Sequence, residues 1–193
     1  MKTLQTLLKE DKQIKTLQIL LDEDHLNACK EAITWIGDRT IEQSMIDIHR
    51  GDWCLFMGML LGVNKKKLTL AKGKCAETVM HLMSDQRSVD AVKASIDYGN
   101  GLISKADLQI VAAAANKAAN AAAIAAEDDV DESAAYAADA ASYAANVSGY
   151  ASDCAYASSY AADSETINQQ QTADICKEIL GQLIIDKVNG LYK

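Results

Sequence analysis

Few residues of this sequence have the types and spacing that catalysis requires. The three histidines, His25, His49 and His81, lie far apart, and none belongs to a motif for a nucleophile or a metal ion. His49 precedes Arg50 and Gly51, so a cation in the last turn of a helix explains it better than a catalytic base. Phosphate-binding loops, dinucleotide-binding loops and nucleophile elbows are absent from the sequence. We therefore expect a protein that is not an enzyme.

Two carboxylates offer the alternative of an enzyme. Asp38 follows Gly37 and Asp52 follows Gly51, and two carboxylates in one cleft could act as general acid and base, with His49 beside them. Each aspartate is explained more simply as the N-cap of a helix that follows a helix-ending glycine. The alternative therefore requires that these side chains converge in the folded protein.

One basic cluster could bind an anion. Lys65, Lys66 and Lys67 open a predicted helix, where positive charge opposes the helix dipole and so does not stabilise the helix. Together with Arg87 they could form a pocket for a phosphate group. A solvated patch of lysines is the simpler interpretation.

The cysteines and the apolar segments indicate where the protein resides. The five cysteines lie at least 20 residues apart and lack the spacing of a zinc site, which favours buried thiols in a reducing compartment. The N-terminus lacks the apolar block of a signal peptide, and the longest apolar run, 53–63, is too short to cross a bilayer. We expect a cytoplasmic protein without a metal, a cofactor or a membrane segment.

Negative charge is concentrated in the second half of the chain. Residues 1–105 contain 15 Lys or Arg and 14 Asp or Glu, whereas residues 106–193 contain 4 and 13, so net charges of +1 and −9 make up the total of −8. No basic residue lies between Lys117 and Lys177, although that stretch contains ten carboxylates. Such a field repels nucleic acid and anionic membranes and attracts a basic partner. A solvated surface that only maintains solubility is the alternative.

Tyrosines alternate with acidic and amide residues in the same region. On one helix over 131–162, with a bend near Gly149, spacings of four and three residues would place them in a single stripe. The stripe consists of Glu132, Tyr136, Asp139, Tyr143, Asn146, Tyr150, Asp153, Ala157 and Tyr160. We expect most of its tyrosines to pack inward against an alanine-rich core. An exposed recognition face, or a mixture of the two, is the alternative.

The elements that position these residues are predicted to be helices. The sequence has 32 alanines and no proline, and no segment shows the sustained alternation of a strand. Capping residues and glycines predict helices over 27–36, 40–49, 53–61, 65–83, 85–98, 104–126, 131–162 and from 164 onward. Residues 1–26, with near-duplicate leucine motifs at 3–11 and 16–24, are predicted to form a helical arm.

This pattern predicts a single all-α domain over 1–193, a compact bundle of about eight helices. Its parts are the arm at 1–26, a core at 27–163 and a last helix at 164–193. Of the 32 alanines, 25 lie in residues 106–163, so tightly packed alanine-rich helices are expected in the C-terminal half.

Four segments together resemble a known family. They are Ala28-Cys29-x-x-Ala32-Ile33-x-Trp35-Ile36-Gly37, Arg50-Gly51-Asp52-Trp53, Lys67-Leu68-x-Leu70-Ala71-x-x-x-Cys75-Ala76 and Tyr-Ala-Ala-Asp-Ala-Ala at 136–141. In this order they resemble the immunity proteins of bacterial polymorphic toxin systems, in the all-α family with an alanine- and tyrosine-rich C-terminal half. The resemblance covers about residues 27–163. It departs from the family at 85–88, where a proline is usual, and at Tyr98-Gly99, where a tryptophan-containing segment is usual.

The resemblance implies a protein made beside a toxin, often a nuclease, which it inactivates by binding. The acidic region would then contact a toxin or immune effector with a basic face. The candidate contacts are Asp128, Asp129, Glu132, Asp139, Tyr143, Asn146, Tyr150, Asp153 and Tyr160. The motif residues expected to be structural are Cys29, Trp35, Gly37, Gly51, Asp52 and Trp53.

Family members in phage genomes suggest an alternative function. A phage protein of this type would inhibit a host immune effector or sequester a nucleotide immune signal. In the second case tyrosines would stack on the base and the lysine cluster would hold the phosphate. Direct contact with nucleic acid or with a membrane is not expected in either case.

Overall fold

The computed structural model describes residues 30–126, 132–147 and 151–190, and these residues form helices without any strand. The prediction of an all-α bundle of about eight helices is confirmed. The elements are α2 (Lys30–Ile36), α3 (Ile41–Asp47), α4 (Gly51–Leu60), α5 (Lys65–Glu77), the 3-10 turn η1 (Met80–Leu82), α6 (Gln86–Asn100), α7 (Lys105–Ala126), α8 (Ser133–Ala145), α9 (Ala151–Ala161) and α10 (Glu165–Gly190). The predicted arm at 1–26 lies outside the described residues.

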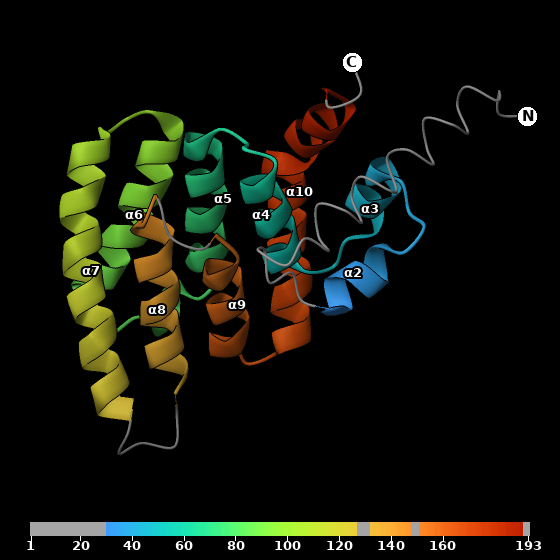
Figure 1. The fold of residues 1–193 in the computed structure, drawn as a ribbon. Helices are drawn as coiled ribbons and strands as arrows, with labels where there is room; N and C mark the ends of the chain where they lie inside the picture. Colours follow the sequence, from blue (N-terminus) through green and yellow to red (C-terminus); the bar gives the residue numbers. More distant parts are fainter. Residues whose placement is uncertain (1–29, 127–131, 148–150, 191–193) are drawn as a thin grey trace, which may run out of the picture.

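Two layers of helices form the body of the bundle (Figure 1). One layer contains α4, α9 and α8, and the other contains α10, α5 and α6. Helix α7 packs against α6 and α8 at one edge, while α3 packs against α10 at the other edge. Helix α5 contacts helices of both layers and therefore lies at the centre.

Most helix ends follow the predicted signals. A side-chain oxygen before α3, α5 and α6 accepts a hydrogen bond from a backbone N–H in the first turn, as N-caps do. Three helices are followed by a glycine with positive φ, a conformation that favours glycine. The caps are Thr40, Asn64 and Asp85, and the glycines are Gly37, Gly62 and Gly101. The helix predicted over 65–83 is shorter in the structure: α5 ends at Glu77, and the separate 3-10 turn η1 follows it.

The start of α4 differs from the prediction. Gly51 does not end the preceding helix, which stops at Asp47; it is the first residue of α4, and Asp52 lies in the first turn instead of at the N-cap. Packing explains the glycine, because a Cβ there would lie 2.6 Å from the Thr172 side chain of α10. Asp52 instead forms an ion pair with Arg50, at 2.8 Å between Nη2 and Oδ2.

The helix predicted over 131–162 is two helices. Helix α8 ends at Ala145, Asn146 has an extended backbone, and α9 runs back alongside α8 (Figure 1). A lysine of α5 binds the end of α8: Lys72 Nζ donates hydrogen bonds to the carbonyl oxygens of Tyr143, at 2.9 Å, and Asn146. A cation bound to these last carbonyls stabilises a helix end at this position.

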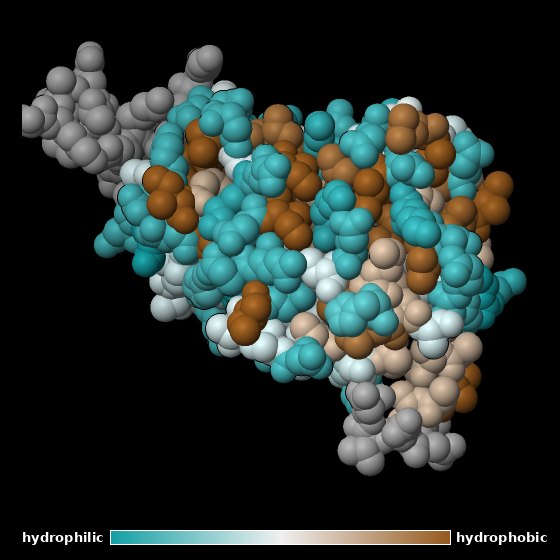
Figure 2. Space-filling model, turned by 180° about the vertical axis from the view of Figure 1, so that it is seen from behind, coloured by the Kyte–Doolittle hydropathy of each residue, from teal (hydrophilic) through white to brown (hydrophobic). Residues whose placement is uncertain are grey.

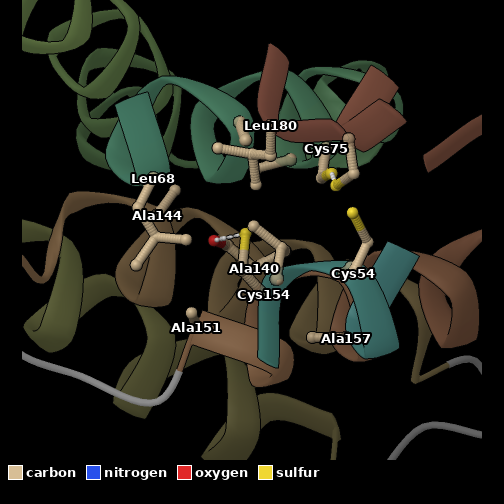
Figure 3. Close-up of a cluster of buried hydrophobic side chains, with 14 of the residues drawn as sticks. Cys54, Leu68, Cys75, Ala140, Ala144, Ala151, Cys154, Ala157 and Leu180 are labelled. Carbon is tan, nitrogen blue, oxygen red and sulfur yellow. Dashed lines mark hydrogen bonds between the residues drawn. The ribbon is translucent and has the colours of Figure 1, made fainter. Parts of the chain in front are cut away.

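The core consists largely of small side chains. Figure 3 shows Cys54, Cys75 and Cys154 among alanines of α8 and α9, with Leu68 and Leu180. Because alanine is small, α9 packs closely on α4 and α5, and α8 packs closely on α5, as expected for the alanine-rich half. Helix α7 is the exception, because most of its alanines are exposed or half-buried.

The surface of the bundle is mixed in polarity, and the cysteines lie beneath it. Seen from behind, apolar side chains are interspersed with polar ones over the bundle (Figure 2). The four described cysteines are free and buried, as predicted, while Cys29 lies outside the described residues. No helix in the described part of the chain is long and apolar enough to cross a membrane.

Candidate functional site

Two residues of the enzyme alternative, His49 and Asp52, make packing and ion-pair contacts. His49 packs against the indole rings of Trp35 and Trp53, at 5.6 and 5.3 Å between ring centroids. Asp52 is paired with Arg50, and the structure records no hydrogen bond or ion pair between these residues and the exposed Asp38. Within residues 30–126, 132–147 and 151–190, no group of three or more His, Cys, Asp or Glu side chains is placed to hold a metal ion.

The motif residues around α2 and α4 have structural contacts. Trp35 and Trp53 lie 5.4 Å apart between ring centroids, and Arg39 and Arg50 each cover one indole at 4.8 Å. The contact between the two indoles holds α2 against the start of α4, while each cation–π contact lies within its own stretch of chain. This cluster agrees with the structural role expected for these residues.

The structure separates the basic residues of the predicted anion pocket. Residues 65–67 begin α5, and the Lys66 ammonium lies beside Gly101 at the C-terminal end of α6. Arg87 lies in the first turn of α6, 14 residues before Gly101 and therefore about 20 Å away along the helix. Its guanidinium is already paired with Asp85, at 2.6 Å. A pocket that combines the lysines with Arg87 is therefore not formed.

The tyrosine stripe is folded back on itself. Tyr136 near the start of α8 meets Tyr160 near the end of α9, with 5.5 Å between ring centroids. On one continuous helix the same two residues would lie about 36 Å apart. Tyr156 packs against Tyr160 as well, at 4.6 Å between centroids. The three rings therefore form a row at one end of the α8–α9 hairpin.

An open groove lies beside this row, where α7 ends, α8 begins and α9 ends. It has two lobes, of about 240 and 320 Å³, which share Glu132 and Tyr136 in their linings. Ser133 and alanines of α7, α8 and the end of α9 form the rest of the walls. We call this feature the tyrosine groove; its acidic and aromatic lining residues are Glu132, Tyr136, Asp139, Tyr160 and Asp163.

Negative charge dominates the tyrosine groove. The charge of Glu132 raises the pKa of the Tyr136 hydroxyl. A hydrogen bond to Tyr160 is the main cause that raises the pKa of Tyr156 to about 12. Among the described residues that line the groove, none has a basic side chain. The groove is therefore suited to a positively charged group.

The stripe residues around Lys72 are half-buried, and Asp139 lies between them and the groove. Burial raises the pKa of Asp139 and Asp153, and Tyr143 lies near both carboxylates. Lys72 is 1% exposed, and burial lowers its pKa to about 8 against the opposing influence of Cys154 and Asp153. Tyr143 and Tyr136 are half-buried and pack against the core, whereas Tyr156 and Tyr160 remain 46% and 44% exposed, so the structure shows a mixture of the two predicted arrangements.

The predicted partner-binding residues are thus divided between two places. Glu132, Asp139 and Tyr160 line the tyrosine groove. Tyr143, Asn146 and Asp153 lie around Lys72. Asp128, Asp129 and Tyr150 lie outside the described residues.

The structure also adds residues that the sequence pattern did not select. Tyr156 lies outside the repeat of the predicted stripe, but its spacing of four residues from Tyr160 is a helical contact that could have identified it. Asp163 follows the end of α9 and reaches the groove only because α9 folds back beside α8. No local pattern could have identified Asp163.

Comparisons with known proteins give no assignment. No protein-family model, curated protein or solved structure matches this chain. The resemblance to immunity proteins therefore stays a prediction from the sequence. The tyrosine groove is the feature of the described residues from which we infer a function.

Proposed function

We propose that this protein is a non-catalytic inhibitor in the cytoplasm that binds a basic protein, as an immunity protein binds its toxin. The tyrosine groove is the observation that carries the proposal. Partly exposed tyrosines are favoured anchors in protein interfaces, and the lining of the groove carries carboxylates without a basic side chain. An acidic surface accelerates association with a basic partner.

A nuclease toxin is the partner class that best fits this surface. A nuclease must present positive charge to the phosphates of its substrate. An acidic surface bound over that face would compete for the same charges and block the substrate without any chemistry. A host immune effector with a basic face would be bound in the same way.

The nucleotide alternative has less support. Its phosphate would be held by residues 65–67, beside Gly101 and therefore near the start of α7, whereas the tyrosine groove lies at the other end of that helix. Helix α7 has 22 residues and is about 33 Å long, so the two features cannot hold one nucleotide. Within the groove, carboxylates would repel the phosphate.

The proposal is tested by kinetics of binding to a purified basic toxin encoded beside the gene for this protein. Reversing two groove charges, by Glu132→Lys and Asp163→Lys, should slow association at least about tenfold at low salt and weaken neutralisation of the toxin. The double reversal Glu178→Lys with Asp186→Lys is the matched control, because both residues are exposed on α10 and lie about 20 Å or more along that helix from its first residue, Glu165. Equal association rates for the double variant and the control would contradict the proposal.

A further inference from the structure

We infer that the tyrosine groove binds a single arginine side chain of the partner. This inference rests on the proposed function, because the arginine belongs to the basic protein that the function requires. It specifies the contact: a guanidinium stacks on a tyrosine ring while its N–H groups donate to carboxylates.

The aromatic rings are arranged before any partner binds. Tyr136 and Tyr160 are inclined at 42° to each other, and Tyr156 is inclined at 38° to Tyr160. Tyr160 contacts both other rings, at 5.5 Å from Tyr136 and 4.6 Å from Tyr156 between centroids, so each ring is held by a neighbour. Rings that are already ordered lose little side-chain entropy on binding. A cation within about 6 Å of such a ring face is attracted to it.

The carboxylates of the groove are available to a cation. Glu132 and Asp163 line the larger lobe together with Tyr136 and Tyr160. Both carboxylates are exposed, and neither forms an ion pair with a basic side chain of the described residues. A guanidinium has five N–H donors in a planar fork, so it can stack on a ring and bind carboxylates at its edge at once.

The size and lining of the larger lobe favour arginine over other occupants. Its volume of about 320 Å³ equals that of about ten water molecules, which is enough for the guanidinium group of an arginine side chain. A lysine ammonium is compact and strongly hydrated, and it cannot stack as a planar group. An anion would meet carboxylates and no cation in the lining.

The experiment is an NMR titration of the full ¹⁵N-labelled chain with acetyl-Gly-Arg-Gly-amide. The matched probes replace arginine by citrulline, which has the same shape without the charge, and by lysine. We expect saturable shifts at the amides around Glu132 and Tyr160 with the arginine peptide, and at least about tenfold weaker binding of the citrulline peptide.

Variants show whether the peptide uses the groove. Tyr160→Phe should retain binding because it keeps the ring face, whereas Tyr160→Ala, and the double variant Glu132→Gln with Asp163→Asn, should each weaken binding about five- to tenfold. The double variant Glu178→Gln with Asp186→Asn, at two exposed positions of α10, is the control for the loss of two negative charges and should bind as the wild type does. Because Glu132 and Tyr160 are exposed, circular dichroism should show that these variants remain folded.

The outcomes separate this inference from the proposed function. Equal binding of the citrulline and arginine peptides, or full binding by Tyr160→Ala, would overturn the inference. Groove variants that lose the peptide yet bind and neutralise the basic toxin as the wild type does would also overturn it, while the proposed function would stand. Conversely, groove-dependent peptide binding by a protein that neutralises no basic toxin would support the inference and refute the proposed function.

Discussion

Lys72 is predicted to make the stability of the folded protein depend on pH in the alkaline range. Burial lowers the pKa of Lys72 from 10.5 to about 8 in the folded protein, where the side chain is 1% exposed. Below pH 8 the amine is protonated in both the folded and the unfolded protein, so it contributes no pH dependence. Between pH 8 and 10.5 the unfolded protein binds the extra proton, and the contribution of Lys72 to the free energy of unfolding therefore rises with pH.

The size of this effect follows from the two pKa values. A difference of about 2.5 at 1.36 kcal/mol per pKa unit corresponds to a gain of about 3 kcal/mol by pH 10.5. The neutral amine still has two N–H donors, which match the carbonyl oxygens of Tyr143 and Asn146. The end of α8 therefore remains bound after Lys72 has lost its proton.

The substitution Lys72→Met tests this reasoning. It leaves two buried carbonyls without their donor, at about 1–3 kcal/mol each, and removes the cost of burying a charge. We expect a loss of about 2 kcal/mol at pH 7 that grows to about 5 kcal/mol at pH 10.5, because the variant lacks the alkaline gain.

The assay is urea unfolding followed by circular dichroism at pH 7.0, 8.5 and 10.5. Asp153 and Cys154 of α9 are titratable groups close to Lys72, and Tyr143 of α8 lies near Asp153. To first order, these groups contribute the same pH dependence to the stability of the wild type and of the variant. Lys74→Met is the control on the same helix, since Lys74 is half-buried and paired with Glu77 at 2.7 Å. A stability difference between wild type and Lys72→Met that stays constant or shrinks with pH would refute the lowered pKa.

Two further predictions concern packing and the tyrosine row. Gly51→Ala should destabilise the protein by about 1–3 kcal/mol in urea unfolding, because the new Cβ would lie 2.6 Å from Thr172; an unchanged midpoint would show that α4 and α10 separate freely. Ultraviolet absorbance titration should resolve one tyrosine with a pKa of about 12, assigned to Tyr156, and Tyr160→Phe should lower that pKa toward 10 because it removes the hydrogen-bond partner. An unchanged titration curve for Tyr160→Phe would refute the hydrogen bond between the two hydroxyls.

Much of the fold could be predicted because the decisive interactions are local. The caps at Thr40, Asn64 and Asp85 accept hydrogen bonds from residues two or three positions ahead, so their sequence signal is complete in itself. Gly62 and Gly101 end helices through their own backbone conformation. The absence of proline and the abundance of alanine determine the all-α class in the same way, residue by residue.

The candidate site could be predicted only in part, because its residues are brought together by the chain reversal after α8. The residue spacing predicts that Glu132 and Tyr160 belong to a stripe, but it predicts this stripe on one continuous helix, whereas the structure has two. Lys72, 71 residues from Tyr143 in the sequence, binds the last carbonyls of α8, and no local pattern reveals such a partner. Likewise, the role of Gly51 depends on Thr172 of a distant helix.

The sequence by itself therefore determined the composition of the site, a set of tyrosines and carboxylates without basic residues, because composition and charge are properties of the chain. Only the tertiary structure decided which of these residues meet. The α8–α9 hairpin brings Tyr136 and Tyr160 within 5.5 Å and places Asp153 beside Lys72. The same acidic and aromatic residue types thus form an open groove at one end of the hairpin and a half-buried cluster around the buried Lys72 at the other, because burial is decided by contacts between helices.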